Sequence, residues 1–255
     1  MRILCMLLLA CSPALLCMTT LPGDAQAKSP HLRECFDNNL QLQLERVLEN
    51  LDLAEAVRQK KLSLALVDLT HQERPRVAAV NGDQMIYAAS LPKIAILLGA
   101  FKQIEDGEMV LDEATKQTLT DMIRYSSNEA ASKMLRRVGP QRVSEILRSP
   151  SYRLYDPAFN GGLWCGKEYG RGVAWERDPL HDLSHGATAL QTARLYYLLE
   201  TRQLLSPSLT REMKSILSNP QLNHKFVKGL ESRPGSKLYR KSGTWKHWHA
   251  DSAIV

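Results

Sequence analysis

The chain has 255 residues, and its 33 lysine and arginine residues against 27 aspartate and glutamate residues give a formal net charge of +6. The basic residues are scattered, and no aromatic-basic module of a nucleic-acid binder is present, which argues against nucleic acid as a partner. Most of this charge is typical of a solvated surface, with attraction to anionic substrates or to the cell envelope as a second interpretation.

Residues 1–27 have the features of an export signal. Arg2 gives a charged start, residues 3–17 form an apolar run too short to span a bilayer comfortably, and Ala25-Gln26-Ala27 offers a cleavage site. Lipid attachment at Cys11 is an alternative, because residues 8–11 resemble a lipobox. We therefore expect a secreted or periplasmic protein without stable membrane insertion, whose mature part, residues 28–255, suits one domain or a closely packed pair.

The mature part keeps two cysteines, Cys35 and Cys165, so it is not a disulfide scaffold. An oxidising compartment would permit one bridge, and two separate buried thiols are equally compatible with the sequence.

The periodicity of apolar residues predicts the elements in chain order. Residues 32–59 predict one long amphipathic helix, and residues 62–69 and 76–80 predict paired strands closed by the turn Asn81-Gly82. A helix starts at Ser90, with Pro92 in its first turn, and ends near Asp106-Gly107. Further helices are predicted over residues 112–125, 129–138, 141–147, 187–199 and 209–217, and strands over residues 237–246 and 250–255.

Residues 155–184 lose this periodicity and are rich in glycine, so they predict a functional loop that is too long for a mere connection. Two strands, many helices and then strands again predict an α+β protein with a helical lobe inserted into a sheet lobe.

Ser90 and Lys93 lie three positions apart, which on a helix places them on one face, one turn from each other. A serine hydroxyl becomes a nucleophile when a neighbouring base takes its proton, and a partly desolvated lysine can do so if its pKa falls. The N–H groups of the helix N-terminus suit a developing oxyanion. Alone, this spacing is also typical of a solvated helix turn.

Two further motifs follow in order. Ser126-Ser127-Asn128 lies between two predicted helices, and Lys241-Ser242-Gly243-Thr244 lies in a predicted strand. The three together resemble the signature of the penicillin-binding proteins and class A β-lactamases, and the element order is closest to class A. The resemblance implies a β-lactamase/transpeptidase-like fold, an antiparallel sheet lobe with an inserted all-helical lobe and the active site between them.

The resemblance also implies roles for the matching residues. Ser90 would be acylated, with Lys93 as base or proton relay, and Ser126 would pass a proton to the departing nitrogen. Asn128 would hold the substrate's side-chain amide. The remaining roles are a positive charge near Ser126 from Lys241, carboxylate binding by Ser242 and Thr244, and an oxyanion hole from the N–H groups of Ser90 and Thr244. Gly243 suits a strand that must let a ligand approach its backbone.

One expected element is missing. Class A enzymes carry Glu-x-x-Leu-Asn in the long loop, where the glutamate activates the water that releases the acyl group, and residues 155–184 contain no match. If Asp182 closes the loop, Glu168 lies closest to the expected position and is the candidate base, although a solvated loop carboxylate explains it equally well. Ser127 also replaces the usual aspartate of the second motif.

We expect an exported serine hydrolase of β-lactamase type that needs no cofactor and acts as a monomer on a small β-lactam. The alternatives are a penicillin-sensitive D,D-peptidase acting on D-Ala-D-Ala-type peptides and a catalytically silent envelope-binding protein. The pairs His181/His185 and His247/His249 permit metal ligation, but polar or substrate-side positions explain them better, so no metal is predicted. The chain ends in an apolar run, and the resemblance implies that a C-terminal strand and helix are missing.

Overall fold

The computed structural model describes residues 31–233 and 235–255. The predicted export signal and the alternative lipid site therefore lie outside the described residues. Within those residues, no helix combines the length and the apolar character that crossing a membrane requires.

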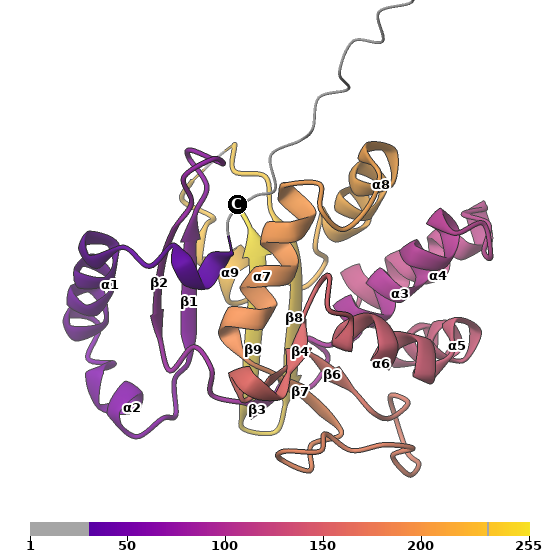
Figure 1. Cartoon of the computed structure of the whole chain (residues 1–255), viewed down its shortest axis with the longest axis horizontal. Coiled ribbons are helices and arrows are strands. Elements are labelled where there is room, and N and C mark those ends of the chain that lie inside the picture. Colours follow the sequence, from indigo (N-terminus) through magenta and orange to yellow (C-terminus); the bar gives the residue numbers. More distant parts are fainter. Residues whose placement is uncertain (1–30, 234) are drawn as a thin grey trace, which may run out of the picture.

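Two antiparallel strand pairs form the sheet lobe. Strand β1 (Leu64–Asp68) pairs with β2 (Arg76–Val80), and β8 (Tyr239–Trp245) pairs with β9 (Trp248–Ile254). Helix α7 (Ala189–Glu200) packs against both pairs, as Figure 1 shows. Because side chains alternate along β2, Val77 joins the main core while Ala78 packs against α1 (Asn38–Asn50) at the other side.

The predicted long helix over residues 32–59 is wrong, because the segment forms the 3-10 helix η1 (Leu32–Glu34), α1 and α2 (Ala54–Arg58). Helix α1 stops where Asp52 adopts a left-handed φ of 56°. The N–H of Leu53 then donates to the carbonyl of Leu48 at 2.8 Å, which closes a Schellman-type cap.

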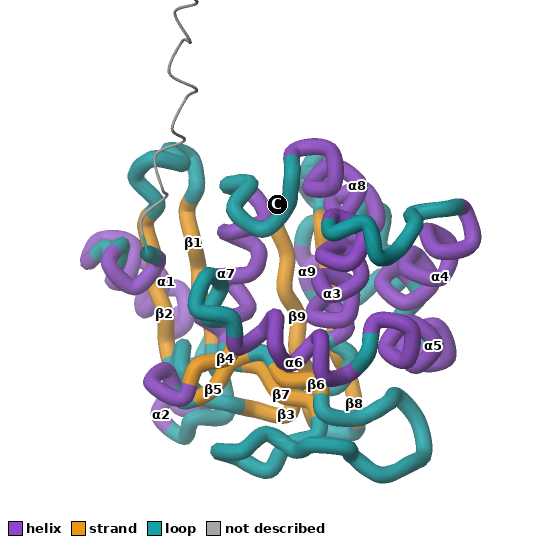
Figure 2. Tube along the Cα trace, turned by 45° about the vertical axis from the view of Figure 1, so that its right-hand side comes forward, coloured by secondary structure: helices purple, strands orange, loops and turns teal. Residues whose placement is uncertain are grey.

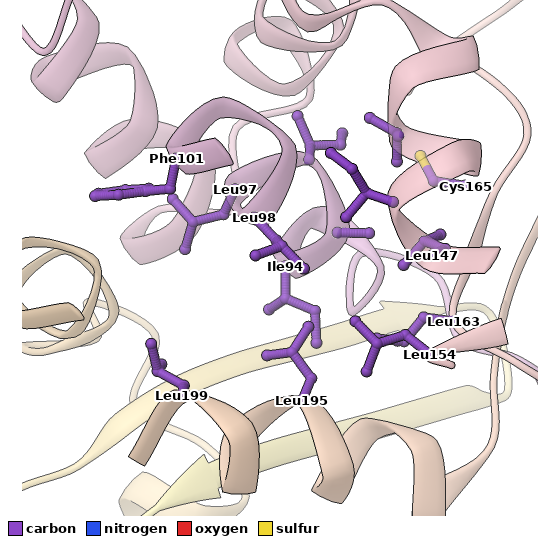
Figure 3. Packing of buried hydrophobic residues seen from close by; sticks show 14 of the residues in the cluster. Ile94, Leu97, Leu98, Phe101, Leu147, Leu154, Leu163, Cys165, Leu195 and Leu199 are labelled. Atoms are coloured by element: carbon purple, nitrogen blue, oxygen red, sulfur yellow. The ribbon is translucent and has the colours of Figure 1, made fainter. Parts of the chain in front are cut away.

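The helical lobe surrounds α3 (Lys93–Glu105), whose side chains are buried nearly all round. Its residues Ile94, Leu97, Leu98 and Phe101 belong to the main core, and Figure 3 shows Ile94 pointing toward Leu195 of α7. The surrounding helices are α4 (Glu113–Arg124), α5 (Asn128–Val138), α6 (Pro140–Arg148) and α8 (Pro207–Leu217), close to their predicted bounds. The short helix α9 (Phe226–Gly229) was not predicted. A core of this kind fixes the first turn of α3, which carries Lys93.

The segment predicted as irregular contains short strands that anchor a smaller loop. Strands β4 (Tyr155–Asp156) and β5 (Gly161–Gly162) pair across the 3-10 helix η2 (Pro157–Phe159). Strand β7 (His185–Ala187) pairs with both β6 (Trp164–Cys165) and β3 (Ile86–Tyr87). Figure 2 shows the loop over residues 166–184 extending from this small sheet. The two ends of the loop are thus tied to the strand that leads to Ser90.

A buried ion pair fixes the β8–β9 hairpin to the segment before it. Arg240 Nε donates to Asp251 Oδ1 at 2.7 Å, and the two side chains are only 1% and 7% exposed. Arg240 also donates to the carbonyls of Leu222 and His224, and Asp251 accepts from the N–H of Phe226. Removing the carboxylate would leave a buried, unpaired guanidinium.

We therefore expect Asp251→Ala to lower the free energy of unfolding by about 3–5 kcal/mol, the cost of breaking a buried pair from one side. The measurement is urea denaturation followed by circular dichroism. The matched control is Arg58→Ala, which breaks the exposed pair with Glu55 and should leave the free energy of unfolding nearly unchanged. Equal effects of the two variants would contradict this role for Asp251.

Candidate active site

Ser90 lies in a tight turn between β3 and α3. The N–H of Leu91 donates to Ala88 O at 3.0 Å and the N–H of Lys93 to Ser90 O at 3.3 Å. Regular helix begins at Lys93, one turn later than the sequence predicted. Ala89, directly before the serine, has a left-handed φ of 50°, a conformation that is costly for a residue with a Cβ. The turn therefore holds Ser90 one helical turn ahead of the lysine.

The Lys93 ammonium joins the first motif to the second. Its side chain is fully buried, and Nζ donates to Ser126 O at 2.5 Å and to Asn128 Oδ1 at 2.8 Å, with Ser126 Oγ at 3.4 Å. Burial lowers the pKa of Lys93 from its usual 10.5 to about 7. A large fraction of this lysine is therefore neutral at slightly alkaline pH and can accept a proton.

Ser126 lies between two amines at the break between α4 and α5. Lys241 Nζ donates to its hydroxyl at 3.0 Å, and Lys93 Nζ lies 3.4 Å from the same oxygen. Burial, and next the charge of Lys93, hold the pKa of Lys241 well below its usual value. Ser126 itself has a φ of 58°, and its neighbour Ser127, not Ser126, caps α5 by accepting from Ala130 N at 3.1 Å. This arrangement suits a hydroxyl that relays protons.

Strand β8 passes directly against the nucleophile turn at Gly243. A Cβ at this position would lie 2.1 Å from Ala88 O and 2.9 Å from Ser90 N, closer than real Cβ atoms approach. The absence of a side chain brings the backbone of Gly243 and Thr244 beside the N–H of Ser90. Ser242 is buried and Thr244 is exposed. All three sequence motifs thus meet at one place.

The structure gives Glu168 a partner on the surface of the molecule. Its side chain is 43% exposed and forms an ion pair with Arg136 on the surface. The other carboxylates of residues 155–184 are also engaged elsewhere. Asp156 pairs with Arg153, Glu176 with Arg148, Asp178 with the Tyr155 hydroxyl and His181 N, and Asp182 with Arg177. In the described part of the chain, the contacts of these five carboxylates thus lead away from Lys93 and Ser126.

Asp178, and not Asp182, closes the loop. Asp178 is 2% exposed and accepts hydrogen bonds from the Tyr155 hydroxyl and from His181 N, whereas the Asp182 side chain is 84% exposed. Glu168 was chosen for its distance in sequence from Asp182. The same distance counted back from Asp178 gives Trp164, which is next to Cys165. Both are buried residues without a carboxylate, so the expected place of the loop base holds none.

Tyr169 is a site residue that the sequence did not reveal. Its ring centroid lies 4.5 Å from Lys93 Nζ and 4.3 Å from the ring of His185. Ser132 clamps its backbone, because Ser132 Oγ donates to Tyr169 O at 2.9 Å and accepts from Tyr169 N at 3.0 Å. A single tyrosine in a glycine-rich loop has no periodicity or motif, so no sequence signal could have found it.

Lys225 was also missed. Its Nζ donates to Gly243 O at 2.7 Å, Thr244 Oγ1 at 2.8 Å and Ala250 O at 2.9 Å. Burial is the main cause that lowers the pKa of Lys225. The residue adds a third amine at the exposed end of the third motif, from a segment with no recognisable pattern.

The histidine and cysteine candidates have other partners. His181 Nε2 contacts Asn160 O and Oδ1, and His185 Nε2 contacts Lys167 O at 3.0 Å. Burial lowers the pKa of His185 to about 4, so its ring is neutral near pH 7. Cys35 and Cys165 are free thiols. Among the residues that the structure describes, no group of three or more histidine, cysteine or acidic side chains could hold a metal ion.

The sequence model of the β-lactamase enzyme family matches residues 43–118 and 114–255, and the chain therefore belongs to this family. No curated protein sequence matches the chain. The predicted family and the predicted α+β fold are confirmed.

Solved structures show the same fold. A β-lactamase from Sphaerobacter thermophilus has 16% identity and a TM-score of 0.61 and covers 81% of this chain and 82% of its own. A β-lactamase from Chitinophaga pinensis has 14% identity and a TM-score of 0.60, with 75% and 78% covered. A double mutant of the class A β-lactamase of the last common ancestor of Gram-negative bacteria has 20% identity and a TM-score of 0.59, with 79% and 82% covered.

We expect Gly243→Ala to slow acylation by a fluorescent penicillin at least about 100-fold, because the added Cβ must displace the turn that holds Ser90 N. Stopped-flow labelling measures the rate. Gly229→Ala is the matched control, since a Cβ there meets nothing within 4 Å. A Gly243→Ala protein that is acylated at the wild-type rate would contradict the close approach of β8.

Proposed function

We propose that the protein is a serine acyl-transfer hydrolase whose Ser90 opens β-lactam amides and carries the acyl group. One observation supports this most. A desolvated Lys93 lies one turn after Ser90 and shares the Ser126 hydroxyl with a second buried amine, Lys241. The sequence of residues 1–27 supports export as part of the same proposal.

Acylation follows from these contacts. Neutral Lys93 takes the proton of Ser90 as the serine oxygen attacks the carbonyl carbon of the lactam. The developing oxyanion is stabilised by the N–H groups of Ser90 and Thr244, at about 3 kcal/mol per donor. When the C–N bond breaks, the nitrogen takes a proton from Ser126, which regains one through the amine of Lys93. For this first step Lys93 must exchange one of its present hydrogen bonds for one to Ser90, as is common on substrate binding.

Hydrolysis of the acyl group from Ser90 is not supported by contacts like those that support acylation. Hydrolysis needs a general base to activate water, and the loop carboxylates are engaged in other contacts. We therefore propose slow deacylation. This favours the second candidate, a penicillin-sensitive D,D-peptidase on D-Ala-D-Ala-type peptides, over a rapid β-lactamase.

We expect fluorescent penicillin to label the wild type and Glu168→Gln at equal rates, and Ser90→Ala to remain unlabelled. Nitrocefin hydrolysis should show one burst per protein and then turn over slowly, with an acyl-enzyme lifetime of about a minute or longer. Mass spectrometry of the intact adduct measures that lifetime.

Each alternative gives a different result in this experiment. An unlabelled wild type means a silent binding protein. Rapid nitrocefin turnover that depends on Glu168 would restore the loop base and overturn slow deacylation.

Lys225 supports binding of an anionic substrate. We expect Lys225→Met to lower the acylation efficiency of a carboxylate-bearing β-lactam about tenfold, because one charge-assisted hydrogen bond near Thr244 is lost. The methyl ester of the same β-lactam should lose far less. The control is Lys228→Met, which removes a nearby exposed lysine that pairs with Glu231. Equal losses for acid and ester would assign Lys225 to the support of β8 alone.

A further inference from the structure

The wall of the site behind Lys93 consists of uncharged groups. The ring of Tyr169 lies against the ammonium, His185 packs behind that ring, and the thiol of Cys165 is buried at the base of the loop. Tyr169 is partly exposed as a residue, but its hydroxyl is buried beside Cys165 in a geometry that makes no full hydrogen bond. The ring thus covers Lys93 on this side.

We propose that Tyr169 is a positioning residue for Lys93, and that its ring excludes water both from the lysine before acylation and from the acyl group afterwards. The proposal rests on the proposed function of Ser90. It assigns one aromatic side chain two opposite effects, faster acylation and slower deacylation.

The first effect concerns the protonation of Lys93. A ring face close to an ammonium favours the charged form, whereas exclusion of water disfavours it. Burial is the largest cause of the lowered pKa of Lys93, and the ring contributes to this burial because its centroid lies 4.5 Å from Nζ. Replacing the ring by a smaller side chain would admit water. The pKa of Lys93 would then rise toward its usual value, and less neutral lysine would be present near pH 7.

Few of the groups that face Lys93 change their protonation state near pH 7. Burial raises the pKa of Cys165 to about 12 and lowers the pKa of His185 to about 4, so both are neutral near pH 7. The pKa of Tyr169 itself lies well above its usual value because of burial. Lys241 is the remaining titrating neighbour, and it contacts Ser126 rather than the ring. A pH shift caused by a change at Tyr169 therefore reports on Lys93 together with Lys241, to which its charge is coupled, and the titration of the Lys93 side chain separates the two.

The second effect concerns the acyl group. The loop has a rigid base, because Cys165 pairs with His185 across β6 and β7 and the backbone of Tyr169 is clamped by Ser132 on α5. The ring is thus held over the lysine. In this place it supplies no base, and in our proposal it keeps water away from the acyl group.

The experiment compares Tyr169→Phe, Tyr169→Leu and Ser132→Ala with the wild type. It measures the rate of penicillin acylation from pH 5 to pH 10, the lifetime of the acyl-enzyme, and the melting temperature of each variant. Tyr169→Phe keeps the ring and should behave as the wild type in both rates. Tyr169→Leu should move the acylation midpoint upward by about one pH unit or more and shorten the acyl-enzyme lifetime about tenfold. Ser132→Ala loosens only the clamp and should give both changes in smaller degree.

The outcomes separate this proposal from the proposed function. An unchanged midpoint and lifetime in Tyr169→Leu overturn the role of the ring, as do two rates that fall together with the melting temperature. If Tyr169→Leu does not fold, a Ser132→Ala protein with wild-type values overturns it. If the wild type is never acylated, the proposed function fails instead. A nuclear magnetic resonance titration of the Lys93 side chain in wild type and Tyr169→Leu then decides the first effect alone.

Discussion

The site depends on one buried cation. Lys93 enters the interior at the first turn of α3, where the hydrophobic core leaves it no contact with water. Burying an amine is unfavourable unless acceptors surround it or it loses its proton. The break between α4 and α5 supplies Ser126 O and Asn128 Oδ1 as acceptors. The lowered pKa allows the amine to lose its proton, which also reduces the cost of burial. The same constraint that makes the lysine a base also fixes the second motif beside the first.

Three residues in or beside the motifs have a strained backbone, among others elsewhere in the described chain. Ala89 and Ser126 have left-handed φ angles, and so does Lys225 near the third motif. Each such residue costs on the order of 1 kcal/mol or more, so it persists only where surrounding contacts impose it. Ser126 is held by Lys93 at its carbonyl and Lys241 at its hydroxyl, and Lys225 by three oxygen acceptors. At Ser126 and at Lys225, the strained backbone directs a polar side chain toward the place where the motifs meet.

The parts of the site that the sequence predicted are those carried by regular elements. The helix after Ser90, the break at Ser126 and the strand at Gly243 each have a periodicity or a turn residue to mark them. Glu168 was assigned by counting back along the loop from Asp182, which was expected to close it. Counting from Asp178 instead moves the expected position of the base from Glu168 to Trp164. Tyr169 and Lys225 belong to irregular backbone, whose course depends on tertiary contacts that lie outside local sequence. The prediction of one long first helix was wrong for a related reason. The helix ends at a left-handed residue, Asp52, and no glycine in the sequence marks that end.

The charged groups of the site determine which steps of the reaction it can promote. Lys93, Lys241 and Lys225 contribute amines, and the carboxylate of Asp251 is taken by Arg240. In the proposed function, such a site attracts an anionic substrate and lowers the pKa of its own amines, and both effects would promote attack by Ser90. Neither effect activates water against the acyl-serine, because that step needs a group that accepts a proton from water at the right place. The amines of the site therefore support the first half of the proposed reaction, whereas the loop carboxylates are engaged in other contacts.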